Sequence, residues 1–455
     1  MILKAHAVTV QKPIMDEHVD EYKLYTIRWL MLFLFVLNAV GSLMQWIEYS
    51  IIADLLVKYY GVSYEAANWT SMIYLLIYIP VVFLANYVLS VYGLRVGVIF
   101  GSVGTCLGAW IKLASASSDR FWVLLLGQSV AAVSQVFVLP TPPLLAATWF
   151  GANEVSMACG IGLAGCQVGV ALGFVLPTII VKPQHDLMDI GADLFCMALA
   201  VAIFCTINSV LTLCFFTDQP PSPPSTARST NLVTEKTSTK QSFVKLFTSR
   251  SYVVLLLVYG VDIGVFFVLS TMLNQVVLKY YPDGSDDAGR IGCLITIAGT
   301  IISVVYGIIL DRFKWYRQTL LATQLICSLM MFMVTFLLYQ GIVFVYITYI
   351  LLGAFLTSVM VIGYEMAAEV TYPEPEGTPA GLLNASAQGF GIMFTYLYSF
   401  LFYKLEDVWS NLSLCVILLV GFVLLTISPF DLKRQAINLR KVHDNQTLLP
   451  TNTVC

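Results

Sequence analysis

The sequence predicts an all-α membrane protein with about twelve transmembrane helices in two groups of six. Of its 455 residues 58% are hydrophobic and 11% charged, and the mean hydropathy is +0.81, outside the range of soluble domains. Runs of about twenty apolar residues, the length that crosses a bilayer, recur along nearly the whole chain. One polar segment near the middle separates the two groups.

The expected spans follow one another with short connections, and each bound is accurate to a few residues. They are 28–56, 67–91, 94–115, 121–148, 154–181, 192–217, 251–279, 290–310, 316–339, 342–368, 379–404 and 409–430. The polar segment contains the run PPSPPST followed by Thr and Lys residues, a composition typical of flexible linkers. The predicted units are an N-terminal tail (1–27), a first bundle (28–217), a linker (218–250), a second bundle (251–431) and a C-terminal tail (432–455).

The distribution of positive charge predicts the orientation. The first 27 residues include four acidic residues and no apolar core, so we expect no cleavable signal peptide. With the N-terminus in the cytosol, 17 of the 24 Lys and Arg residues fall on the cytosolic side, and Lys112 is among the seven outside. We therefore expect both termini and the linker in the cytosol. The plasma membrane is the first expectation, and a mitochondrial or endomembrane location stays open.

The chain shows no signature of an enzyme. Nine of the ten cysteines fall inside expected helices with neither disulfide nor metal-ligand spacing. We find no nucleophile elbow, P-loop, His/Cys metal set or ATP-binding domain. A net charge of -3 without a basic stripe gives no indication of a nucleic-acid partner. These observations predict a monomeric carrier in the lipid bilayer, without cofactor or metal, whose transport is facilitative or driven by gradients.

A loop motif occurs once in each group of spans. Between spans eight and nine, GIILDR with a later Arg317 resembles the major facilitator signature G-x-x-x-D-R-x-G-R. The corresponding loop between spans two and three keeps the later Gly and Arg, but it lacks the first Gly and has Ser90 in place of the Asp. Two ordinary charged loops are the alternative. If the motif is real, a carboxylate paired with arginine holds the halves in one state, and the candidate latch residues are Gly307, Asp311, Arg312 and Arg95.

Several longer stretches identify a family. They are QWIEYS at 45–50, GAWIK at 108–112, WFG at 149–151, LNQ at 273–275, AGRIG at 288–292 and TYPEPEGTPAGLLNASAQ at 371–388. Together they resemble the feline leukaemia virus subgroup C receptor family of major facilitator transporters, over nearly all of the membrane region. The resemblance implies two six-helix bundles related by a pseudo-two-fold axis, with the substrate between them. It also implies choline or ethanolamine as the substrate, or haem.

The resemblance implies a set of binding residues as well. A quaternary ammonium cannot donate a hydrogen bond, so aromatic faces hold it. In the family an aromatic pair from spans one and seven encloses the ammonium and two glutamines orient the hydroxyl. The matching residues are Trp46, Phe267 with Phe266 as the alternative register, Gln167 and Gln388. The bland alternatives are an interfacial or lipid-facing tryptophan and glutamines that only join helices.

Two carboxylates inside the spans need a separate interpretation. In SLMQWIEYS, Trp46 and Tyr49 lie three apart on one helical face, and Gln45 and Glu48 share the neighbouring stripe. Glu48, and Asp262 in span seven, could attract the cation or couple transport to a proton. Alternatively, they pair with other polar groups or sit in a wet vestibule.

Two other functions remain open from the sequence. A haem carrier would suit a wide apolar cavity and an iron ligand, but His6, His18, His185 and His443 all lie in tails or loops. A membrane receptor or sensor that keeps the fold without transporting is the other alternative. Two sequons, Asn68-Trp-Thr70 and Asn411-Leu-Ser413, lie at expected outer ends and are candidate glycosylation sites.

Overall fold

A computed structural model describes residues 25–151, 154–183, 186–221, 245–372, 377–430 and 432–433. Within these ranges the secondary structure is helical, and turns and short loops join the helices. Most of the predicted linker and most of both predicted tails lie outside the described residues, as do all four histidines.

The first half of the chain begins with α1 and ends with α7. Its elements are α1 (Ile27–Ile47), η1 (Ser50–Ile52), α2 (Ala53–Tyr60), α3 (Tyr64–Leu113), α4 (Phe121–Val138), α5 (Thr141–Trp149), α6 (Val155–Ile180) and α7 (Leu187–Phe215). The second half comprises α10 (Arg250–Tyr280), α11 (Ser285–Phe313), α12 (Tyr316–Leu337), α13 (Ile342–Thr371), α14 (Gly377–Lys404) and α15 (Asp407–Ile427).

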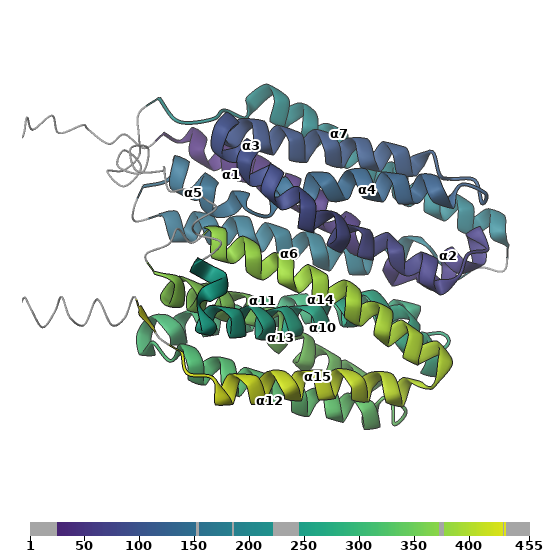
Figure 1. Cartoon of the computed structure of the whole chain (residues 1–455). Helices are drawn as coiled ribbons and strands as arrows, with labels where there is room; N and C mark the ends of the chain where they lie inside the picture. Colours follow the sequence, from purple (N-terminus) through teal and green to yellow (C-terminus); the bar gives the residue numbers. More distant parts are fainter. Residues whose placement is uncertain are drawn as a thin grey trace, which may run out of the picture.

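Twelve crossings of a membrane can be traced through these helices. Ten helical segments of the described residues are long and apolar enough to span a bilayer. The 50-residue α3 turns sharply at Gly93 and supplies two crossings, and the more polar α14, 28 residues long, adds the twelfth. The predicted all-α fold of two six-helix groups is confirmed. Figure 1 shows the two halves as neighbouring bundles, purple to teal and green to yellow, with both ends of the described chain at the same end of the molecule.

Three predicted spans differ in detail from the helices. The first is not continuous over 28–56, because α1 ends at Ile47 and a short 3₁₀ turn precedes α2. Spans two and three are joined through Gly93, whose φ of +86° and ψ of 178° suit only glycine. Span four divides at Pro140 into α4 and α5, because proline at the start of α5 cannot continue the hydrogen bonds of α4.

Small residues determine how closely the first half packs. Gly169 and Gly173 of α6 are one turn apart and face α1. A Cβ at Gly169 would lie 2.7 Å from the carbonyl oxygen of Val40, and a Cβ at Gly173 would lie 2.6 Å from that of Met44. Only glycine leaves room for this backbone approach, which is the usual mode of helix packing in membranes. The two glycines therefore allow α6 to pack closely against the last turns of α1, which carry Trp46.

Candidate functional site

The site lies where the two halves of the chain meet. Trp46 stands on the last turn of α1, and Phe267 lies near the middle of α10. Their ring centroids are 5.6 Å apart and the ring planes make an angle of 80°, an edge-to-face arrangement. The indole is 6% exposed, so Trp46 faces protein rather than lipid. The pair therefore joins the first bundle to the second at the position where the sequence predicts an ammonium site.

A glycine on α14 allows the Phe267 ring to reach the seam. A Cβ at Gly391 would lie 2.7 Å from Cδ2 of Phe267 and 3.1 Å from Cδ1 of Leu75, which belongs to the first half. Phe266 lies beside its neighbour, with centroids 6.1 Å apart, but the recorded ring contact with Trp46 is made by Phe267. Of the two candidate positions, Phe267 is therefore the one whose ring contacts Trp46.

The two predicted glutamines approach this region from different helices. Gln388 stands one turn before Gly391, on the face of α14 that meets Phe267. Its Oε1 and the indole Nε1 of Trp46 are buried and have no hydrogen-bond partner among the described residues. Both atoms therefore keep their hydrogen-bonding capacity for a bound ligand.

Gln167 lies on the opposite side of the seam, in α6. It is partly exposed and shares a helical stripe with Phe174 and Thr178. Those two side chains meet α11 of the second half at Gly292 and Gly289. Gln167 therefore lies on the interface side of α6, and no contact joins it directly to the aromatic pair.

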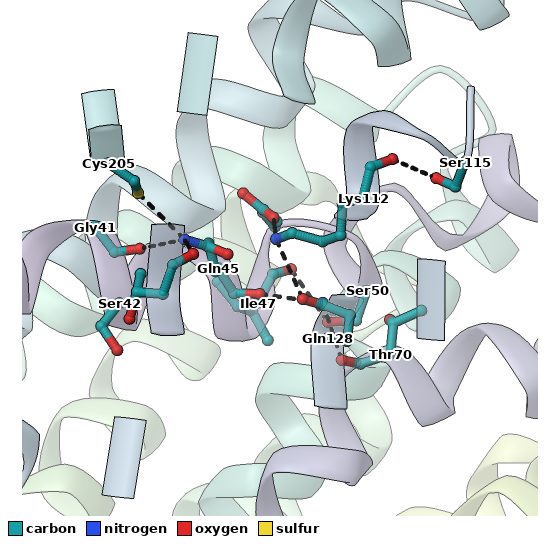
Figure 2. Close-up of polar contacts among 12 residues, drawn as sticks. Gly41, Ser42, Gln45, Ile47, Ser50, Thr70, Lys112, Ser115, Gln128 and Cys205 are labelled. Carbon is teal, nitrogen blue, oxygen red and sulfur yellow. Dashed lines mark hydrogen bonds and ion pairs between the residues drawn. The ribbon is translucent and has the colours of Figure 1, made fainter. Parts of the chain in front are cut away.

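The carboxylate of Glu48 has a partner within its own bundle. Lys112 of α3 donates to Glu48 Oε1, and the two side chains are 1% and 2% exposed. Lys112 also bonds Gln128 of α4 over 3.2 Å, and Figure 2 shows its ammonium directed toward that side chain. Lys112, which the sequence counts among the outer charges, is therefore a buried counter-ion to the membrane carboxylate and does not lie in water. Glu48 points away from Trp46 although the two residues share a turn.

Asp262 lies deep in the second half. It is fully buried on α10, with Gln324 of α12 as its polar neighbour. This places Asp262 among α10, α12 and α15, because Gln324 in turn donates to the carbonyl of Leu418 over 3.1 Å. The structure therefore does not bring Asp262 into contact with the aromatic pair.

Hydrogen bonds join the halves at the end of the molecule that carries α2, away from the described chain ends. Gln275 Nε2 donates to Asn68 Oδ1 over 2.6 Å, and the hydroxyls of Ser71 and Thr271 are 3.0 Å apart. Lys182 pairs with Asp286 over 2.9 Å. The seam is thus closed at this end, which we call the distal end (Figure 1).

The distal contacts also bear on glycosylation. Asn68 is 2% exposed, and Asn411 is fully buried with its Oδ1 accepting from Tyr398. Neither asparagine can accept a glycan in this conformation, so the two sequons are not glycosylation sites of this state.

The predicted latch residues lie at the opposite end. Asp218, just beyond α7, accepts a hydrogen bond from the backbone N–H of Arg95 over 2.9 Å, and its carboxylate lies against Gly93. Asp311 and Arg312 are exposed at the end of α11, and open space surrounds Gly307. In the first half, the carboxylate of Asp218 thus contacts the bend at Gly93. Ser90, just before this bend, stands where the motif has an Asp.

Sequence reasoning missed two groups of polar residues. The first is Lys112 with Gln128, and the second is the pair Tyr259 and Tyr364, whose hydroxyls both donate to Asn384 Oδ1, over 3.0 and 2.8 Å. A charge-balance argument could have found Lys112, since a carboxylate inside the membrane requires a cation nearby. The tyrosines carry no such signal, because aromatic residues are abundant throughout the spans.

Comparisons with known proteins agree on the class of protein. The family model described as Major Facilitator Superfamily matches residues 30–396. The choline/ethanolamine transporter flvcr2a of Danio rerio is 38% identical over 92% of this chain and 90% of its own length. Homo sapiens FLVCR2, named a choline/ethanolamine transporter, is 38% identical over 90% of this chain and 79% of its own. An uncharacterized MFS-type transporter of Caenorhabditis elegans is 43% identical, covering 95% and 73%.

Solved structures share the fold at low sequence identity. A bacterial homologue of the human lysosomal transporter Spinster superposes with a TM-score of 0.67 at 12% identity, covering 89% of this chain and 97% of that one. The E. coli fucose:proton symporter superposes with a TM-score of 0.59 at 15% identity, covering 89% and 99%.

Proposed function

Because the chain belongs to the major facilitator superfamily, and within it to the family of the choline/ethanolamine transporters FLVCR1 and FLVCR2, we propose that it transports choline and ethanolamine by alternating access. The observation that supports this substrate class is the contact between Trp46 and Phe267 across the two halves. Tryptophan is the best aromatic partner for a cation, and each such contact contributes about 0.5 to 2 kcal/mol, more as water is excluded. An ammonium beside this pair touches both bundles at once.

Recognition of the cation relies on the rings rather than on a carboxylate. Glu48 is already neutralised by Lys112, and Asp262 is buried in the second half away from the seam. The hydroxyl of choline or ethanolamine then donates to the free Oε1 of Gln388, with Gln167 facing the same seam from α6. Phe266 supports the position of Phe267 and has no direct role in binding.

The closed distal end corresponds to one state of the transport cycle. Hydrogen bonds and the Lys182–Asp286 ion pair hold the bundles together there. We place both termini in the cytosol, since most Lys and Arg residues then face inward, and we propose the plasma membrane as the location. In this orientation the closed end is the outer side. The carrier acts as a monomer in the bilayer, because each chain holds both halves of the site.

Uptake of radiolabelled choline into cells that express the chain tests the proposal. We expect saturable uptake whose KM is raised by about 2- to 30-fold in Trp46→Ala and by less in Trp46→Phe, since phenylalanine keeps a weaker aromatic face. Trp122→Ala is the matched control, because that indole is 78% exposed to the surroundings and should not affect uptake. Absence of choline uptake with a fall in cellular haem would indicate the haem carrier instead. Binding of choline without flux would indicate a receptor.

A further inference from the structure

The end of α1 is held by a side chain from α4 and by one from the 3₁₀ turn that follows α1. A helix leaves its last carbonyls without intrahelical partners. Here the carbonyl of Gln45 accepts from Gln128 Nε2 over 3.1 Å, and the carbonyl of Ile47 accepts from the hydroxyl of Ser50 over 3.2 Å. The chain then forms the 3₁₀ turn of η1 before α2 begins. Trp46 lies between Gln45 and Ile47 in the chain. The hydrogen bonds that hold these two carbonyls therefore also hold the backbone that carries the indole.

Gln128 connects three segments through one amide. Its Nε2 donates to the carbonyls of Gln45 and Thr70, each over 3.1 Å. Its Oε1 accepts from the Tyr74 hydroxyl over 3.0 Å and from Lys112 Nζ over 3.2 Å. The side chain is fully buried, and all four of its hydrogen-bonding positions are used. Figure 2 shows Gln128 with Lys112, Thr70 and Gln45 around it. It therefore ties the break in α1 to both parts of α3.

Lys112 completes the cluster. Its ammonium bonds both Glu48 and Gln128, and it lies 5.2 Å from the centre of the Tyr49 ring. The lysine stem fits because α4 has a glycine beside it, where a Cβ at Gly127 would lie 2.5 Å from Lys112 Cγ. The residues on either side of Trp46 in this turn are thus bound to the first bundle, while its indole contacts the second.

We propose that Glu48, Lys112 and Gln128 are positioning residues for the cation site: they fix where α1 breaks and thereby hold Trp46 against Phe267. The role rests on the proposed function, since the aromatic pair is the ammonium site. It assigns Glu48 to the architecture of the site rather than to attraction of the cation. The cluster acts through the backbone of residues 45–50 and does not touch the substrate.

Transport kinetics of Gln128→Leu provide the first test. The substitution keeps volume and leaves the Glu48–Lys112 pair in place, but it frees the carbonyl of Gln45. We expect the KM for choline to rise on the order of tenfold, because small errors in the placement of a binding group weaken a preorganised site. The maximal rate of uptake per folded transporter should change less than the KM. Gln324→Leu, which removes a fully buried glutamine that donates to a carbonyl in the second half, should leave the KM unchanged.

A second variant covers the possibility that Gln128→Leu does not fold. Glu48→Gln combined with Lys112→Met neutralises the pair without leaving a lone charge, and we expect the same rise in KM. If either folded variant has the KM of the wild type and only its amount in the membrane falls, the cluster is merely structural and the proposal is wrong.

A structural measurement made without substrate tests the positioning role independently of the proposed transport of choline. Structures of the wild type and of Gln128→Leu in lipid nanodiscs should differ at residues 45–52, and the 5.6 Å separation of the two rings should be lost in the variant. An unchanged ring pair would contradict the positioning role even if the wild type carries choline. A displaced pair in a protein that does not transport choline would support the positioning role and reject the substrate.

Discussion

A carboxylate two positions after the central tryptophan invites an electrostatic explanation of cation binding. The structure gives Glu48 a buried counter-ion, Lys112, and directs both into the first bundle. The pair carries no net charge, so its attraction for a third charge falls off more steeply with distance than that of a lone carboxylate. Recognition of the ammonium then depends on the aromatic faces. These faces attract the positive charge without requiring an N–H donor, so they bind methylated and unmethylated ammonium groups alike.

The buried ion pair should be visible in stability measurements. Lys112→Met leaves Glu48 buried without a cation, and breaking a buried pair from one side costs about 3 to 5 kcal/mol. Glu48→Gln with Lys112→Met should recover most of that loss. Thermal unfolding of purified protein in detergent measures both. If the single Lys112→Met variant unfolds at the wild-type temperature, the pair does not contribute to stability.

The glycine beside Phe267 gives a second prediction at this scale. In Gly391→Ala the new methyl group would lie 2.7 Å from the Phe267 ring and would push it from the seam. We expect the affinity for choline to fall several-fold with only a modest loss of stability. Gly389→Ala, two residues away in open space, is the control and should bind choline normally. Equal affinities for the two variants would show that Phe267 has no role in binding.

Hydropathy predicts the helices well and their interruptions poorly. The length and number of spans follow from the energy of burying apolar residues in lipid, so twelve crossings could be counted from the sequence. The break after Ile47 could not, because it depends on a glutamine and a lysine brought from α4 and α3. Proline signals the division between α4 and α5, whereas the bend at Gly93 becomes evident only from its positive φ.

The bend in α3 should be intolerant of a side chain. Gly93→Ala forces an alanine to φ +86° and places its Cβ 2.5 Å from Oδ1 of Asp218. We expect a loss of about 2 kcal/mol in unfolding free energy. Gly307→Ala, a helical position surrounded by open space, should be neutral or slightly stabilising. Comparable losses for the two variants would argue against a strained bend at Gly93.

At the scale of the molecule, the family and the aromatic pair were predictable from the sequence. Which end of the interface between the two bundles is closed was not. The motif residues Trp46, Phe267 and Gln388 identify the site by resemblance, whereas Asn68, Thr271 and Gln275 close the distal end through partners far apart in the sequence. Such contacts depend on which conformation the two bundles adopt. One sequence encodes both conformations of an alternating-access carrier, so it does not indicate which of the two a given structure adopts.

The distal contacts allow the cycle to be stopped. Ser71 and Thr271 come from different halves and their hydroxyls are 3.0 Å apart, so Ser71→Cys with Thr271→Cys should form a disulfide under oxidation. In a background without the native cysteines, we expect oxidation to stop choline uptake and reduction to restore it. The single Ser71→Cys variant is the control. Continued uptake by fully cross-linked protein would show that the distal end need not open.

Equilibrium binding of radiolabelled choline to the purified protein tests the central claim most directly, because it does not depend on flux, orientation or membrane location. Wild type, Trp46→Ala and Phe267→Ala should be compared at equal amounts of folded protein. If the two rings hold the ammonium, each substitution should raise the Kd by about 2- to 30-fold. A Kd that both variants share with the wild type would contradict the aromatic site.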